Sequence, residues 1–194
     1  MRLLAAFVLA AGLGACGDAA APKFLGSDVT GGSFGRDFKL TDASGTPRSL
    51  ADFRGKVVVM FFGYTQCPDA CPTTLSELAA VMQKLGPDAA RVQVLFVTVD
   101  PERDTGELLA QYVPAFNPAF VGLRGDAQAT AEVAKEFKVI YQKQPGTTPG
   151  SYSMDHSAGT FIFDPHGRLR VYVSYGQPEQ VFEHDIAELL RAKT

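Results

Sequence analysis

Cys67 and Cys71 are separated by three residues and form the pattern Cys-x-x-x-Cys. The apolar run 57–62 before them is typical of a buried strand, and the amphipathic run after them is typical of a helix. The dipole and free N–H groups of a helix N-terminus favour thiolates. Within one turn, this spacing puts the two Cα atoms about 6 Å apart, within disulfide range. The pair can therefore form a disulfide, exchange one, or bind a soft metal ion.

His156 is the third residue that could take part in this chemistry. It lies just before an expected strand at 160–163, where the chain of a thioredoxin-like sheet packs beside the cysteine loop. Two thiolates and one imidazole form a soft ligand set, which suits Cu(I) and can hold Cu(II) in a tetragonal site. Zinc would usually require a fourth ligand or a water molecule. We interpret His166, in a turn, and His184, on a solvated helix, as structural residues.

The elements that must position these residues follow from hydrophobic patterning. Strands are predicted at 38–42, 57–62, 92–99, 120–123, 160–163 and 169–173. Helices are predicted at 72–85, 104–112, 126–137 and 178–192, and residues 144–155 are predicted to be a loop. This order predicts an α/β domain with a thioredoxin-like mixed sheet, covered by helices on both faces and ending in a β-hairpin and a helix.

Charged residues follow the second central strand. Asp104 and Glu107 resemble a capping box at the start of the helix at 104–112. Two roles of equal weight are possible for the charged residues Asp100, Arg103 and Asp104. They form a charged wall near the cysteines, or Asp104 caps the helix while the other two pair at the surface.

The N-terminus predicts export and a lipid anchor. Arg2 precedes an apolar run at 3–15, which is shorter than the roughly 20 residues that span a bilayer and suits a signal peptide. The run ends in Leu13-Gly14-Ala15-Cys16, which resembles the lipobox of bacterial lipoproteins. That resemblance implies cleavage before Cys16 and lipid on its sulfur and amine. The alternative is an ordinary secretory signal with a chance cysteine.

Length and composition bound the domain organisation. The chain has 194 residues, of which 46% are hydrophobic, and this suits one domain with a sizeable core. We predict a signal peptide at 1–15, a lipidated cysteine and flexible tether at 16–35, and a folded domain at 36–194. The net charge of −3 gives no electrostatic case for binding nucleic acid.

Four segments together resemble the Sco/SenC family of thioredoxin-like copper-binding proteins. They are the strand and loop at 53–65, the Cys-x-x-x-Cys-Pro loop at 67–75, the Asp-Pro-x-Arg-Asp segment at 99–105 and the histidine motif at 155–157.

The resemblance implies that Cys67, Cys71 and His156 bind one copper ion. Asp155 either orients His156 by accepting a hydrogen bond from its ring or caps a turn, and the two roles have equal weight. It also implies a role in cytochrome c oxidase assembly, with oxidase subunit II as client. The further expected partners are a copper donor and a periplasmic thiol reductase. The location would be the periplasmic side of a bacterial membrane, and the client's location favours the inner membrane.

Several alternatives use the same cysteines. A thiol–disulfide reductase acting on subunit II or another exported protein needs the redox-active pair Cys67 and Cys71, but not His156. A peroxiredoxin is disfavoured, because Met60 and Tyr64 stand where that family has Pro and Thr. A permanent disulfide is disfavoured because so short a loop gains little from closure. Ligands alone do not separate a copper chaperone from an electron-transfer or copper-sensing protein.

Overall fold

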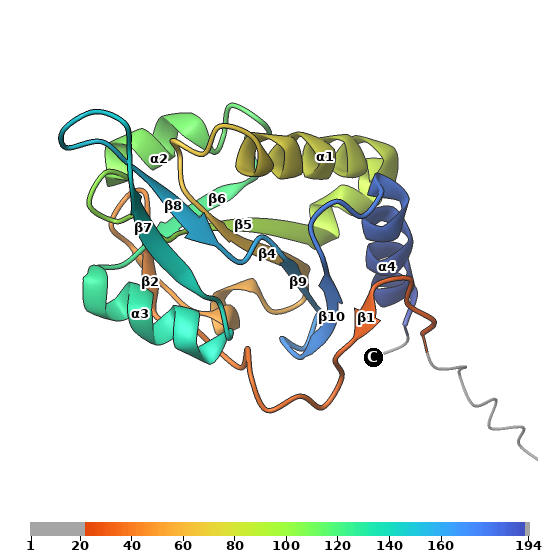
Figure 1. Cartoon of the computed structure of the whole chain (residues 1–194). Helices are drawn as coiled ribbons and strands as arrows, with labels where there is room; N and C mark the ends of the chain where they lie inside the picture. Colours follow the sequence, from red (N-terminus) through yellow and green to blue (C-terminus); the bar gives the residue numbers. More distant parts are fainter. Residues whose placement is uncertain (1–21, 193–194) are drawn as a thin grey trace, which may run out of the picture.

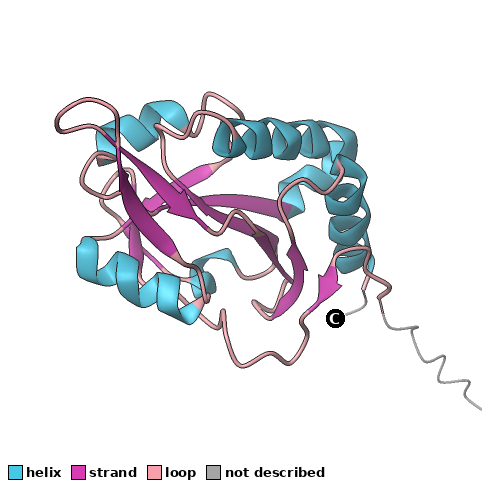
Figure 2. Ribbon diagram, in the orientation of Figure 1, coloured by secondary structure: helices cyan, strands magenta, loops and turns pink. Residues whose placement is uncertain are grey.

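A computed structural model describes residues 22–192 (Figures 1 and 2). Its main feature is an eight-stranded sheet in the order β1-β10-β9-β4-β5-β6-β2-β3. The pairs β4–β5 and β5–β6 are parallel and the other pairs are antiparallel, so the sheet is mixed. The strands are β1 (Ser27–Asp28), β2 (Leu40–Asp42), β3 (Pro47–Arg48), β4 (Val57–Gly63), β5 (Val92–Thr98), β6 (Val121–Arg124), β9 (Thr160–Phe163) and β10 (Leu169–Val173).

The two central strands are buried along their whole length. Every residue of β4 and β5 is buried, which requires cover on both faces because successive side chains point to opposite sides of a sheet. Phe61 contacts Phe96, which in turn contacts Tyr112 at the end of α2. The next residue, Phe62, points to the opposite face and contacts Phe137 at the end of α3.

Helices supply that cover (Figure 1). The four α-helices are α1 (Ala70–Leu85), α2 (Gly106–Tyr112), α3 (Ala127–Glu136) and α4 (Glu179–Arg191), and two short 3₁₀ helices are η1 (Leu50–Phe53) and η2 (Gly86–Arg91). α1 packs against α4 beside the sheet. The predicted thioredoxin-like α/β fold, with its mixed sheet and its terminal hairpin and helix, is confirmed.

The prediction of a loop at 144–155 is correct only for residues 146–151, which connect two strands that were not predicted. β7 (Tyr141–Pro145) and β8 (Tyr152–His156) form an antiparallel hairpin, which is a two-stranded sheet separate from the main one. The sequence of β7 is too polar to show a strand pattern. The two strands satisfy each other's backbone groups locally, however, so an apolar face is not needed for them to pair.

Two predicted helix starts are also corrected. α1 begins at Ala70 rather than at Pro72, because the first amides of a helix need no partner and proline is therefore tolerated within the first turn. α2 begins at Gly106 rather than at Asp104. Thr105 is its N-cap residue, and its side chain accepts a hydrogen bond from the amide of Leu108.

Part of the segment predicted to be a tether is attached to the domain. The amides of Leu25 and Gly26 donate to the two carboxylate oxygens of Asp185 at 2.8 and 2.9 Å, and β1 then pairs with β10. The predicted signal peptide at 1–15 and Cys16 lie outside the described residues. Within residues 22–192, no helix is long and apolar enough to cross a bilayer.

Candidate metal centre

Three potential ligand side chains converge at the carboxyl end of β4. Each of these residues contributes one ligand atom, and the three atoms lie within 4.8 Å of one another. The residues are Cys67, Cys71 and His156. Both cysteines are free thiols, and Cys71 Sγ lies 3.8 Å from His156 Nε2. The residues come from the loop after β4, the first turn of α1 and the end of β8. The structure therefore brings together the three residues that the sequence analysis singled out.

The start of α1 arranges the two sulfur atoms. The backbone amide of Cys71 donates to Cys67 Sγ at 3.4 Å. This amide lies in the first helical turn, where amides have no partner within the helix. Asp69, in the N-cap position, makes no capping hydrogen bond with its side chain. The sulfur of Cys67 thus takes the role of a capping acceptor, and this fixes it above the helix end.

Gly63 makes room for the buried thiol. It is the last residue of β4, and a Cβ atom added to it would lie 2.6 Å from Cys71 Sγ. Real Cβ atoms essentially never approach another atom so closely. The sequence analysis did not single out this glycine, although its position directly after an apolar strand was a signal of close approach.

Cys71 is 1% exposed. Burial raises the pKa of its thiol, a backbone hydrogen bond from Tyr64 opposes this effect, and the neighbouring Cys67 adds to the rise. Burial thus opposes the thiolate form that the helix N-terminus favours. A thiolate ligand must be deprotonated, so binding of a cation here releases a proton.

His156 presents Nε2 to the cysteines. Its other ring nitrogen, Nδ1, lies 3.1 Å from the backbone carbonyl of Ser157, and its ring packs edge-on against Tyr64. A proton on Nδ1 donates to that carbonyl, which leaves the lone pair of Nε2 facing Cys71. Burial lowers the pKa of His156, although the Ser157 carbonyl and Asp155 oppose this effect. The imidazole is therefore neutral at neutral pH, as a metal ligand must be.

The predicted role of Asp155 in orienting His156 is corrected by this geometry. Asp155 is exposed, and the acceptor that faces Nδ1 of His156 is a backbone carbonyl. Side chains on a strand alternate between its two faces, so neighbours such as Asp155 and His156 point in opposite directions.

Asp104 anchors the chain just before the cysteines. It is fully buried and accepts hydrogen bonds from the amide and hydroxyl of Thr65 at 3.0 and 2.6 Å and from the hydroxyl of Thr98 at 2.6 Å. Burial raises its pKa, and the hydrogen bonds from the two threonines limit the rise. Of its two predicted roles, the role as a helix cap is wrong, because Thr105 caps α2 and the carboxylate of Asp104 instead binds Thr65 and Thr98.

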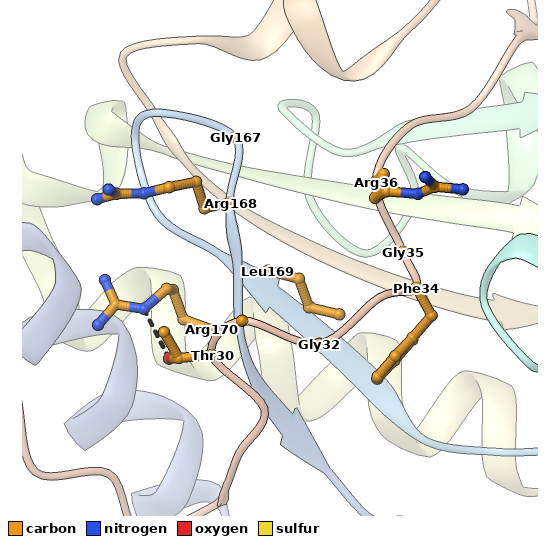
Figure 3. A pocket seen from close by; sticks show the side chains of 10 residues that line it. Thr30, Gly32, Phe34, Gly35, Arg36, Gly167, Arg168, Leu169 and Arg170 are labelled. Atoms are coloured by element: carbon orange, nitrogen blue, oxygen red, sulfur yellow. Dashed lines mark hydrogen bonds between the residues drawn. The ribbon is translucent and has the colours of Figure 1, made fainter.

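A separate cavity of about 620 Å³ lies between residues 30–36 and the start of β10. Arg168 and Arg36 point in opposite directions, away from the space between them (Figure 3). Arg168 pairs with Asp164, and Arg36 pairs with Glu136. The cavity adjoins the end of β9 at Phe163, which pairs with Leu169. The cluster of Cys67, Cys71 and His156 lies towards the other end of β9. We therefore do not assign the cavity to the metal centre.

The donor set decides which metal the cluster suits. It is the one group of three close Cys, His, Asp or Glu ligands within residues 22–192. Two sulfur atoms and one imidazole nitrogen fit a soft ion such as Cu(I), whereas Mg²⁺ and Ca²⁺ require oxygen ligands.

Comparison with known proteins gives a consistent result. The model of a family described as SCO1/SenC matches residues 27–191. "Protein SCO2 homolog, mitochondrial" from Mus musculus is 41% identical over 152 residues, which cover 76% of this chain and 59% of that protein. The chain matches 53% of the bovine and human homologues, so it spans little more than half the length of these relatives.

Solved structures extend the likeness to the whole domain. Apo Sco1 from Thermus thermophilus is 42% identical with a TM-score of 0.76, and the match covers 88% of this chain and 99% of that one. ScoI from Bradyrhizobium japonicum, a structure with copper bound, is 37% identical with a TM-score of 0.73, and the match covers 82% of this chain and 99% of that one.

Proposed function

Because the chain belongs to the SCO1/SenC family, we propose that it binds one copper ion and serves in the assembly of cytochrome c oxidase. Cys67, Cys71 and His156 are the proposed ligands. The observation that carries this proposal is the convergence of their ligand atoms within 4.8 Å. ScoI from Bradyrhizobium japonicum, whose structure has copper bound, supports the choice of metal.

The exposure of the ligands suggests a route for copper transfer. Cys71 is buried, whereas Cys67 and His156 are partly exposed. A partner's ligands can therefore reach copper from the side of Cys67 and His156 and displace these two residues first. We propose the dinuclear copper site of oxidase subunit II as the recipient, and a separate copper donor as the source.

The redox state of the cysteines controls this function. Both thiols must be reduced to bind Cu(I), and a disulfide between Cys67 and Cys71 removes two of the three ligands. A periplasm oxidises such pairs, so we propose a thiol reductase as a further partner. Lipid on Cys16 would hold the domain at the periplasmic face of the membrane, the inner membrane being favoured by the client.

The test is a Cu(I) titration of the reduced protein against a competing chelator, with His156→Ala and the control His166→Ala. We expect one tightly bound copper per chain. His156→Ala should weaken binding at least about tenfold, because it removes a ligand. His166 is exposed in the turn after β9, so its replacement should change nothing. Weak wild-type binding, or binding indifferent to His156, would refute the proposal.

A thiol–disulfide reductase is the second candidate function. The observation that favours it is the contrast between the partly exposed Cys67 and the buried Cys71, which suits an attacking and a resolving thiol. The His156→Ala variant separates the two functions. Thiol exchange needs no imidazole ligand, so reduction of a disulfide substrate would survive the change if reduction were the main function.

A further inference from the structure

Arg103 joins the two segments that carry the metal ligands. Its Nη1 donates to the side-chain oxygen of Gln66 at 3.0 Å and to the backbone carbonyl of Tyr152 at 2.8 Å. Gln66 directly precedes Cys67, and Tyr152 is the first residue of β8, the strand that ends at His156. A single guanidinium nitrogen therefore ties the cysteine loop to the histidine hairpin.

The guanidinium of Arg103 is itself held on several sides. Its Nε donates to Asp100 Oδ2, and the other carboxylate oxygen of Asp100 accepts a hydrogen bond from the hydroxyl of Tyr152 at 2.8 Å. The guanidinium also lies over the Tyr152 ring, 3.6 Å from its centroid, and 5.8 Å from that of Tyr64. Planar stacking combined with several directed hydrogen bonds is available to arginine and not to lysine.

Met154 of the histidine hairpin packs in the core, but the side-chain hydrogen bonds that hold β8 near the cysteines involve Arg103 and Asp100. The hairpin is not part of the main sheet, and a cavity of about 200 Å³, lined in part by Asp100, Lys143 and Met154, lies beside it. Lys143 pairs with Glu102, but both side chains are well exposed, and such pairs contribute little to stability. The position of β8 relative to the cysteine loop therefore depends strongly on Arg103.

We propose that Arg103 is a positioning residue, which sets the separation of His156 from Cys67 and Cys71. It acts through Gln66 and Tyr152. The inference rests on the proposed copper site for its purpose, but the contacts that carry it are present in the protein without metal. Without Arg103 the hairpin moves away from the cysteine loop, and the two thiolates lose their third ligand.

The first test measures Cu(I) affinity in Arg103→Met, which keeps the apolar length of the side chain and removes its donors. The control is Arg91→Met, because Arg91 bonds to Asp88 and to the Leu190 carbonyl and, within residues 22–192, to no residue near the metal ligands. Arg103→Met should weaken binding at least about tenfold, as loss of a group that orients a metal ligand does. Combined with His156→Ala, it should cause no further loss, because both changes remove the same ligand. Unchanged affinity, or fully additive losses, would overturn the proposal.

The second test needs no metal. In the reduced apo-protein, the rings of Tyr64 and His156 have centroids 5.9 Å apart, so their ring protons should give a nuclear Overhauser effect. We expect Arg103→Met and Arg103→Lys to abolish it and Arg91→Met to retain it. Persistence of the effect in Arg103→Met or Arg103→Lys would overturn the positioning role. A wild-type protein that retained the effect and bound no copper would instead refute the proposed function alone.

Discussion

At the scale of single residues, the metal centre depends on the small size of a neighbouring glycine as well as on its ligands. Gly63 has no Cβ atom, and this allows Cys71 Sγ to occupy the space beside the end of β4. The position of that sulfur atom in turn determines where Nε2 of His156 meets it. Ligand geometry is therefore sensitive to a single added carbon in the neighbouring strand.

We expect Gly63→Ala to weaken Cu(I) binding although it removes no ligand. The added methyl group displaces Cys71 Sγ, and overpacking of this kind typically destabilises a core by about 1–3 kcal/mol. The matched control is Gly122→Ala. Its added methyl group crowds Val113 and Leu109, which are not metal ligands. Chelator competition and thermal unfolding measure the two effects. Equal copper affinity in both variants would show that the site tolerates the displacement.

At the scale of elements, α4 fastens the N-terminal segment to the domain. Asp185 is fully buried and accepts hydrogen bonds from the amides of Leu25 and Gly26, just before β1 joins the edge of the sheet. The amide of Val29 continues this attachment by donating to the backbone carbonyl of Arg170. The segment is therefore fastened both to α4 and to the edge of the sheet.

Asp185→Asn should release this segment without affecting the metal centre. An asparagine has one acceptor oxygen, so one of the two amides loses its partner, which costs about 1–3 kcal/mol. Amide hydrogen exchange at residues 25–28 should accelerate, and Cu(I) affinity should stay unchanged. The control is Glu183→Gln on the same helix, whose exposed side chain pairs with Lys84. Protection of residues 25–28 equal to wild type would contradict the assigned attachment.

At the scale of the whole molecule, the end of the sheet opposite to the metal centre is organised around one carboxylate. Asp164 is 3% exposed. It accepts hydrogen bonds from the amides of His166 and Arg168 and from the guanidinium groups of Arg168 and Arg170. Burial alone would raise its pKa, but the hydrogen bonds from Arg168 and Arg170 outweigh burial and hold the pKa below its usual value.

This shift makes part of the stability depend on pH. The unfolded chain binds a proton at Asp164 near pH 4, whereas the folded chain binds it only at lower pH. The contribution of Asp164 is therefore fully present above about pH 4 and is lost as the pH falls through the lower native value. Asp164→Asn should lower the free energy of unfolding by roughly 1–3 kcal/mol at pH 7, and this deficit should narrow below about pH 4.

Urea unfolding at several pH values measures this effect. The matched control is Asp88→Asn, whose carboxylate pairs with Arg91 at the exposed surface and should contribute little at any pH. A deficit for Asp164→Asn that is the same at pH 7 and pH 3 would contradict the assignment.

Elements that local patterning encodes could be predicted from the amino-acid sequence alone. Continuous apolar runs predicted β4 and β5, and helical spacing predicted α1, because the burial of each element shows in its own residues. The spacing of Cys67 and Cys71 at a strand-to-helix junction was a local signal too. His156 was linked to them by its place in the predicted topology and by the family resemblance.

The support of the metal centre, in contrast, became visible in the folded structure. The partners of Arg103, Asp104 and Gly63 are distant in the sequence or lie in another element, so no local pattern reports them. The hairpin of β7 and β8 escaped prediction for the same reason, since its strands are stabilised by each other, by Arg103 and by the packing of Met154 in the core. Contacts of this kind form only when the folded chain brings separate segments together.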